Sequence, residues 1–92
     1  MNIDETTFEV DDQVITEHIG DEMILLDLKG ERYLSVDRVG QQIWALLSGG
    51  ASKSAVIDEL QSKYQVERSV LTSDVEKFLA KLLDLGLVRP AA

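Results

Sequence analysis

The sequence contains few side chains able to act as nucleophiles, general bases or metal ligands. Cysteine is absent, and His18 is the only residue with an imidazole. A nucleophilic triad needs a base beside its nucleophile, but His18 and its neighbour Glu17 alternate along a predicted strand and therefore point to opposite faces. We predict no catalytic residues and a protein that is not an enzyme.

Two further patterns have the composition of a ligand site but not its spacing. The acidic pairs at residues 11–12, 21–22 and 58–59 lack the Asp-x-Asp-x-Asp-Gly order of a calcium-binding loop. Residues 49–54, Gly-Gly-Ala-Ser-Lys-Ser, follow a helical pattern and lack the full spacing of a phosphate-binding loop. We expect neither a metal ion nor a cofactor.

Two aromatic residues remain as candidates for binding. Trp44 lies in a predicted helix beside Ile43 and Leu47, where a core position is expected. Tyr33 lies in the middle of a predicted strand. Its ring either lines a shallow pocket beside a bound peptide or packs against the sheet, and both interpretations stay open at this point.

The composition is that of one small folded domain. The chain has 92 residues, of which 45% are hydrophobic and 28% charged, so we expect a single domain over residues 1–92. The acidic amino terminus does not resemble a signal peptide, and no apolar stretch approaches the roughly 20 residues of a membrane-spanning helix. We therefore expect a cytoplasmic protein without a membrane partner.

Charge is distributed unevenly along the chain. Residues 1–31 hold ten acidic and one basic residue, a balance of −9, and residues 32–92 hold seven and eight, a balance of +1, which together give the net charge of −8. An acidic chain repels nucleic acid at long range. A local basic patch is still allowed by Arg32, Arg38, Arg68, Lys77 and Lys81.

Alternation and turn residues predict three consecutive strands. Residues 14–19 alternate with a period of two and end at a turn at Gly20, and residues 23–26 form an apolar run that we expect to be a central strand covered on both faces. Residues 32–36 form the third strand. The short turns between them imply an antiparallel meander. Residues 1–11 show no period, and we expect them to form a loose arm or an irregular lead-in.

Helical spacing begins after Val36. Asp37 is expected to cap a first helix that stops at residues 49–50, and Ser52 to begin a second. A third and longest helix ends near Gly86, with Pro90 preventing its continuation. The sequence leaves two positions for its first turn, one helical turn apart, because Ser69 and Ser73 both fit a capping position.

These elements predict an α+β, winged-helix-like fold, in which a three-stranded antiparallel sheet is followed by three helices whose apolar faces cover one face of the sheet. In such a meander the third strand, residues 32–36, is an edge strand. Its unpaired N–H and C=O groups are available to another extended chain. An exposed edge of this kind also allows two copies to pair as a homodimer.

The order of several short motifs resembles the PqqD-like family. An apolar strand at residues 25–28 is followed by residues 33–37, then by Val39-Gly40 and Ile43-Trp44 on a helix. Similarity extends over about residues 14–87. Two positions depart from the family pattern: Leu34 stands where a second aromatic residue is common, and the turn glycine, Gly30, is displaced by one residue.

The resemblance implies a non-catalytic peptide chaperone, or recognition element, for ribosomally made and post-translationally modified peptides. Members of the family bind the leader segment of a precursor antiparallel to the third strand, with its apolar side chains between that strand and the third helix. A modifying enzyme, such as a radical S-adenosylmethionine enzyme or a leader peptidase, then acts on the precursor. Carried over to this sequence, the implied peptide-binding residues are Arg32, Tyr33, Leu34, Ser35 and Val36, with Asp74, Val75, Phe78 and Leu82 across the groove and Arg68, Lys77 and Lys81 at its rim.

Two other classes of protein share parts of this pattern. A winged-helix protein binding nucleic acid is the main alternative, since three helices and a hairpin suit a DNA groove and its backbone, although the net acidity opposes it. An acyl or peptidyl carrier protein is also small and acidic. The Asp-Ser-Leu attachment motif of carriers is missing, however, and carriers do not begin with strands.

Overall fold

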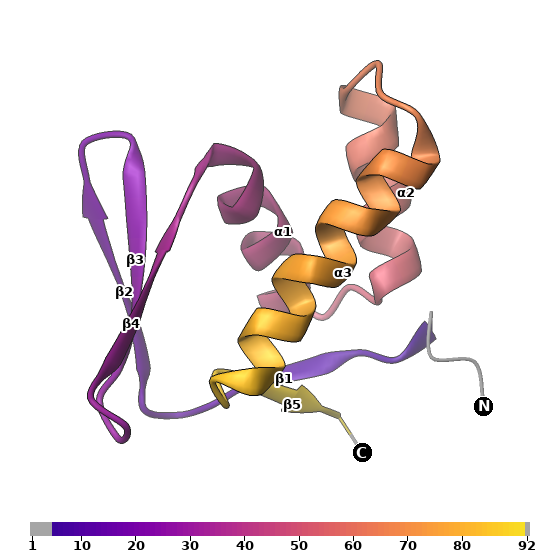
Figure 1. Cartoon of the computed structure of the whole chain (residues 1–92). Coiled ribbons are helices and arrows are strands. Elements are labelled where there is room, and N and C mark those ends of the chain that lie inside the picture. The colour runs from indigo at the N-terminus through magenta and orange to yellow at the C-terminus, as the bar shows by residue number, and fades with distance from the viewer. Residues whose placement is uncertain (1–4, 92) are drawn as a thin grey trace.

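The computed structural model describes residues 5–91 and has the expected α+β architecture. Its elements, in chain order, are β1 (Phe8–Val10), β2 (Val14–Ile19), β3 (Glu22–Asp27), β4 (Arg32–Val36), α1 (Arg38–Ser48), α2 (Lys53–Lys63), α3 (Arg68–Asp84) and β5 (Val88–Pro90). Figure 1 shows the β2–β3–β4 sheet on one side of the three helices and the β1–β5 pair below α3.

The three predicted strands form an antiparallel sheet in the order β2-β3-β4, so β4 is an edge strand as expected. Side chains alternate between two faces of β3. Met23, Leu25 and Asp27 are buried on the inner face, whereas Ile24 and Leu26 on the outer face are only half-buried. The expectation that β3 is covered on both faces was therefore wrong, because the helices cover only the inner face of the sheet.

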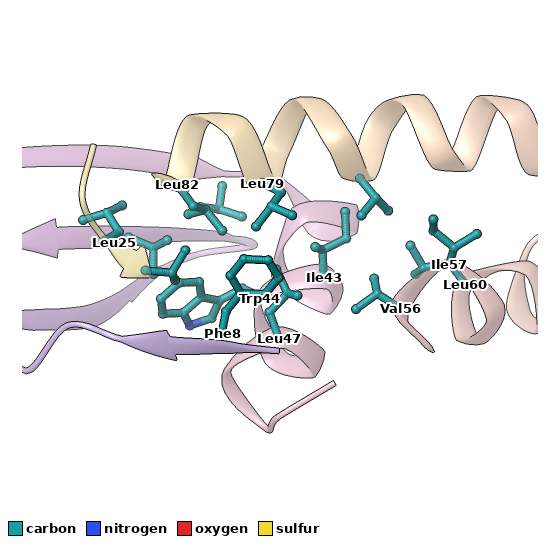
Figure 2. Close-up of a cluster of buried hydrophobic side chains, with 14 of the residues drawn as sticks. Phe8, Leu25, Ile43, Trp44, Leu47, Val56, Ile57, Leu60, Leu79 and Leu82 are labelled. Carbon is teal, nitrogen blue, oxygen red and sulfur yellow. The ribbon is translucent and has the colours of Figure 1, made fainter. Parts of the chain in front are cut away.

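The hydrophobic core lies between that inner face and the helices. Leu25 and Val36 of the sheet meet Ile43 of α1 and Leu82 of α3 there, and Trp44 is buried as predicted (Figure 2). Each helix contributes residues spaced by three or four positions, which is the pattern of a helix with one buried face. The helices are therefore held in place mainly by tertiary packing.

Two helices begin at the predicted caps, and the third does not. The N–H of Gly40 donates to Asp37 Oδ1 at 2.8 Å, and the N–H of Ala55 donates to Ser52 Oγ at 3.2 Å. Helix α3 starts at Arg68 after Glu67, with no side-chain cap, so neither Ser69 nor Ser73 has the expected role. Burial of Leu71 in the core and ion pairing of Arg68 with Asp58 hold this first turn instead.

The amino-terminal segment is more ordered than the sequence suggested. Residues 1–4 of the expected loose arm lie outside the described part of the chain, but Phe8–Val10 form strand β1 and pair antiparallel with Val88–Pro90. Phe8 is buried, and Glu9 forms an ion pair with Arg89 at 3.3 Å. A three-residue strand is too short to show a period, and its partner lies at the opposite end of the sequence.

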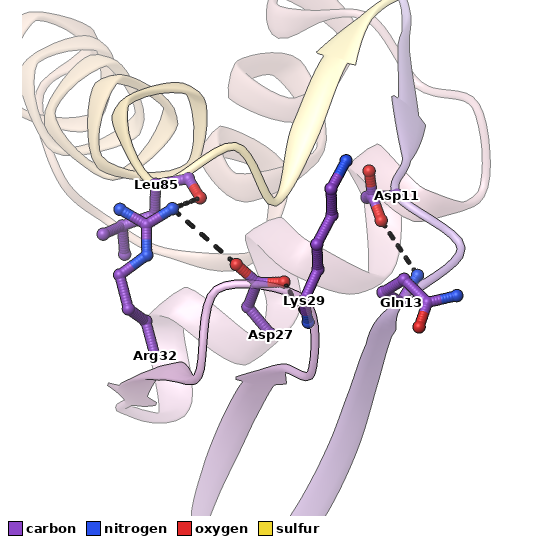
Figure 3. Close-up of polar contacts among 6 residues, drawn as sticks. All are labelled: Asp11, Gln13, Asp27, Lys29, Arg32 and Leu85. Carbon is purple, nitrogen blue, oxygen red and sulfur yellow. Dashed lines mark hydrogen bonds and ion pairs between the residues drawn. The ribbon is translucent and has the colours of Figure 1, made fainter.

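The turn between β3 and β4 explains the displaced glycine. Glu31, rather than Gly30, has the positive φ, at 55°. A Cβ at Gly30 would lie 2.6 Å from Asp27 Oδ2, so this glycine provides space for the buried carboxylate. Arg32 Nη2 reaches the same oxygen at 3.7 Å and donates to the carbonyl oxygen of Leu85 at 2.7 Å (Figure 3). The turn thereby ties β4 to the end of α3.

Substitutions at the two turn positions should have opposite effects. Gly30→Ala is expected to lower the free energy of unfolding by about 1–2 kcal/mol, because the new methyl group displaces the Asp27 carboxylate. Glu31→Gly should raise it by about 0.5–1 kcal/mol, because glycine adopts a positive φ without steric cost. Urea denaturation of both variants measures the two effects, and a stabilised Gly30→Ala variant would contradict this explanation.

Candidate functional site

A groove of about 590 Å³ runs between β4, the start of α1 and α3. Its apolar surface comes from β4, α1 and α3, namely Leu34, Val36, Val39, Ile43 and Phe78, and charged side chains surround it, namely Glu22, Asp37, Asp74, Lys77 and Lys81. Ser35 and Gly40 complete the lining. An apolar groove bordered by charges suits a ligand with alternating apolar and polar side chains.

Gly40 allows the three elements to approach each other at one end of the groove. A Cβ at this position would lie 2.6 Å from Val36 Cγ1 and 3.4 Å from Phe78 Cε1. The first of these separations is shorter than any normal contact between carbon atoms, so a side chain at residue 40 would push α1 away from β4. Asp37, three residues before Gly40, caps α1. The cap sets where the first helical turn starts, and the glycine sets how closely that turn packs.

The free edge of β4 lies beside this groove, and the hydrogen-bond pattern shows which backbone groups are unpaired. The N–H of Leu28 donates to the carbonyl oxygen of Gln13, so alternate residues of β3, including Leu26, pair with β2. The residues between them, including Leu25, direct their N–H and C=O groups toward β4. There they pair with Leu34 and with the residues two positions before and after it. It follows that the backbone groups of Tyr33 and Ser35 point to the free edge.

Seven of the twelve predicted peptide-binding residues line the groove. They come from β4 and from one side of α3 and are Leu34, Ser35, Val36, Asp74, Lys77, Phe78 and Lys81. Leu34 and Phe78 are half-buried, so part of each side chain is available to a ligand. The remaining five predicted residues lie elsewhere, each for an identifiable reason.

Val75 and Leu82 were expected to lie across the groove, but both are 0% exposed. They occupy the face of α3 that packs on the core, next to the face that borders the groove. One helix presents both faces within a few residues, so a helical period alone does not separate them. The two residues support the groove from below and do not line it.

The two strand residues at the start of β4 also point away from the groove. The Tyr33 side chain is 71% exposed and lies on the outer face of the sheet beside its partner Leu26. The Tyr33 ring lies outside this groove and lines a separate hollow with Leu26, while the Tyr33 backbone faces the free edge, so a shallow pocket beside a bound peptide stays a prediction for this ring. Arg32 lies on the inner face and is occupied by Asp27 and the carbonyl of Leu85.

The basic residues predicted at the rim behave differently from one another. Arg68 Nη1 lies 2.8 Å from Asp58 Oδ1 and donates to Gln61 Oε1, which places it against α2 rather than the groove. Lys77 and Lys81 are exposed, and no ion pair or hydrogen bond joins either side chain to the rest of residues 5–91. These two lysines are available to a ligand.

The sequence analysis did not assign several residues that line the groove to the binding site. Val39, Gly40 and Ile43 were recognised only as family motif or helix positions. Glu22 reaches the groove because its neighbour Met23 pairs with Val36, which brings the start of β3 beside the end of β4. Only the strand register places Glu22 there, and the sequence contains no local signal for it.

Metal-binding side chains do not gather within residues 5–91. No cluster of three or more His, Cys, Asp or Glu side chains is arranged to hold a metal ion in this part of the chain. His18 is exposed on β2, outside the groove. The groove therefore offers binding contacts, namely an open strand edge, apolar surface and charges.

Comparison with known proteins agrees with a binding role. Residues 22–88 match the family model for coenzyme PQQ synthesis protein D (PqqD). A PqqA binding protein of Rhodopseudomonas palustris strain BisB5 is 38% identical over 64 residues, and that of strain HaA2 is 36% identical over the same length. Each match covers 70% of this chain and 63% of the relative, so the similar region spans under two thirds of those proteins.

Two solved structures share the fold over nearly their whole length. TbiB1 in complex with the TbiA(β) leader peptide has a TM-score of 0.81 and 33% identity, covering 91% of this chain and 98% of that one. Lasso peptide synthetase B1 complexed with the leader peptide has a TM-score of 0.81 and 25% identity, covering 90% and 98%. Both similar proteins were thus solved with a leader peptide bound.

Truncating two neighbouring side chains of α3 should change the stability of the fold by very different amounts. Leu82→Ala is expected to destabilise the fold by about 2–5 kcal/mol, because it leaves a cavity in the core. Lys81→Ala should change stability by no more than about 0.5 kcal/mol, because the side chain is exposed and unpaired. Thermal or urea unfolding of the two variants tests the assignment, and equal losses would show that Leu82 and Lys81 are not on separate faces.

Proposed function

Because this chain belongs to the PqqD family, we propose that it binds the leader segment of a ribosomally made precursor peptide by adding it as a strand to β4. The observation that carries the proposal is the open edge of β4 beside an apolar groove. An extended peptide at this edge pairs with the free backbone groups of Tyr33 and Ser35. Backbone pairing contributes affinity that depends little on the peptide sequence.

Side chains of the bound peptide supply selectivity. Successive residues of a strand point to opposite faces, so every second side chain of the leader faces the groove. Strand β4 has five residues and is therefore about 16 Å long at roughly 3.3 Å per residue. Over that length, two or three leader side chains can contact the apolar surface formed by Leu34, Val36 and Phe78.

The chain acts without catalysis and presents the leader to a second protein. The groove supplies neither a nucleophile beside a base nor, within residues 5–91, a cluster of metal ligands. The modifying enzyme is a radical S-adenosylmethionine enzyme or a leader peptidase, which acts on the precursor while its leader is held. The proposed location of this step is the cytoplasm, where ribosomes release the precursor. None of the helices described in residues 5–91 is long and apolar enough to span a bilayer.

The arrangement of charges does not favour nucleic-acid binding. Of the five residues considered as a basic patch, Arg68 pairs with Asp58 and Arg32 with Asp27, so each of these two arginines already has an acidic partner within the protein. Helix α3 also carries acidic side chains, including Asp74 and Asp84, which repel phosphates. A homodimer through β4 remains compatible with the fold, and it would compete with the leader for the same edge.

Removing one free N–H group from the edge tests strand addition. Ser35→Pro is expected to weaken binding of a fluorescent candidate leader by about tenfold or more, because the variant loses an outward donor and its ring obstructs pairing. The fold should persist, since proline is tolerated where the strand N–H is not used in the sheet. Fluorescence anisotropy measures the affinity, and circular dichroism verifies the fold.

The matched control is Ser35→Ala, which removes the hydroxyl group and retains the backbone N–H. It should bind the leader within about twofold of the unchanged protein, because strand pairing does not use the side chain. If Ser35→Pro folds normally and binds as tightly as Ser35→Ala, the leader does not pair with β4 and the proposed mode of binding is wrong.

A further inference from the structure

The groove has acidic side chains at one end and basic side chains toward the other. We propose that it selects the order of charges along the bound peptide and favours a segment in which basic residues precede acidic residues by four positions, an even separation that keeps both side chains on one face of the strand. This inference rests on the proposed leader binding and names the class of leader that the site selects.

The acidic end lies where β4 meets α1. Glu22 comes directly before Met23, which pairs with Val36, so Glu22 lies just beyond the end of β4 near Asp37. Asp74 precedes Phe78 by one helical turn, and Phe78 lies against Gly40 at this same end. All three carboxylates line the groove.

The opposite end is basic and lies beside the last turns of α3. Because Arg32 at the start of β4 donates to the carbonyl oxygen of Leu85, β4 and α3 run in opposite directions along the groove. Lys81 is one turn before Leu85, and Lys77 is one turn before Lys81. From Asp74 to the end of α3, the groove therefore changes from acidic to basic.

Three charged side chains of α3 at the groove are unpaired, whereas two pairs of charges on α2 and at its contact with α3 are joined. Within residues 5–91, Asp74, Lys77 and Lys81 have no ion pair or side-chain hydrogen bond. On α2 and at its contact with α3, by comparison, Lys63 pairs with Glu59 and Arg68 with Asp58. Free charges that border a groove can pair with a ligand without first breaking an internal contact.

The direction of the peptide sets which charge comes first. Every strand pair in the β2–β3–β4 sheet is antiparallel, and antiparallel pairing is slightly more stable per residue than parallel pairing. A peptide antiparallel to β4 runs in the same direction as α3, so its amino-terminal part meets Asp74 and its carboxy-terminal part meets Lys81. The seven helical steps from Asp74 to Lys81 span about 10 Å, which is the length of roughly three to four residues of strand.

Charge order, rather than net charge, is the quantity selected. A wholly acidic peptide would gain contacts with Lys77 and Lys81 but would be repelled by Glu22 and Asp74. A wholly basic peptide would be attracted by the two carboxylates and repelled by the two lysines. A peptide with basic residues first satisfies both ends at once. Oppositely placed charges also oppose binding in the wrong register or direction.

Two synthetic peptides of identical composition test this directly. Both carry the same alternating apolar residues, and one has two lysines followed by two glutamates, whereas the other has the glutamates first. Fluorescence anisotropy should give a dissociation constant about fivefold to tenfold lower for the lysine-first peptide at low salt. The preference should fall toward twofold at about 0.5 M salt, where the screening length is only a few ångströms.

Exchange of the groove charges should reverse the preference. The variant with Glu22→Lys, Asp74→Lys, Lys77→Glu and Lys81→Glu is expected to bind the glutamate-first peptide more tightly, by a similar factor. A matched control exchanges an ion pair on α2, with Glu59→Lys and Lys63→Glu, and should keep the original preference. Circular dichroism and thermal unfolding establish that both variants are folded.

Failure of this inference can be distinguished from failure of leader binding. Equal affinity for the two peptides, with both lost in Ser35→Pro, would overturn the charge-order proposal and retain strand addition at β4. Tighter binding of the glutamate-first peptide by the unchanged protein would also overturn it. If neither peptide nor any candidate leader binds, or if binding is unaffected by Ser35→Pro, the proposed function itself is wrong.

Discussion

Strand β4 has to be held against the helices while one of its edges stays unpaired, and most of the structure serves this requirement. At one end of β4, Gly40 lets α1 and Phe78 approach Val36 more closely than a side chain would allow. At the other end, Arg32 joins the buried Asp27 carboxylate to the last carbonyl groups of α3. The groove is the space between these two attachments. Its width is set by packed and hydrogen-bonded contacts, so it is present before any peptide arrives.

The division of work between backbone and side chains follows from this geometry. The edge groups of Tyr33 and Ser35 are the same in any sequence, so they can hold many peptides. The apolar surface and the surrounding charges are formed by side chains, so in the proposed function they are the part that selects the leader. The outer face of the sheet exposes Tyr33 and Ile19, and the leader side chains that do not face the groove would lie on this side.

Local sequence patterns predicted most of the strands and helices. They failed for elements whose formation depends on contacts between residues far apart in the sequence. The strands of the meander, the caps at Asp37 and Ser52, and the edge position of β4 all depend on residues close together in sequence. Strand β1 depends on a partner some eighty residues away, and the start of α3 depends on α2. Neither was visible as a local signal.

The same limit explains the candidate site. Residues 32–36 and the third helix were expected to border a groove, and the groove is lined by residues 34–36 and by one side of α3, but the sequence does not show which face each side chain occupies. Tyr33 was assigned to the groove because it lies in the correct strand, and the register places its ring on the opposite face. Leu82 and Lys81 are adjacent in α3, and only packing shows that the first supports the groove and the second borders it.

Pairing of β1 with β5 has a practical consequence for handling the protein. Phe8 and Pro90 are register partners, and both line a hollow with Leu79 and Leu83 of α3, whereas the groove is lined by Lys77 and Lys81. Figure 1 shows the β1–β5 pair apart from β4. A fluorescent domain, an affinity label or a solid support joined beyond either strand would therefore leave the groove accessible. On the proposed function, the domain would then deliver its bound peptide to an enzyme fused beyond either strand.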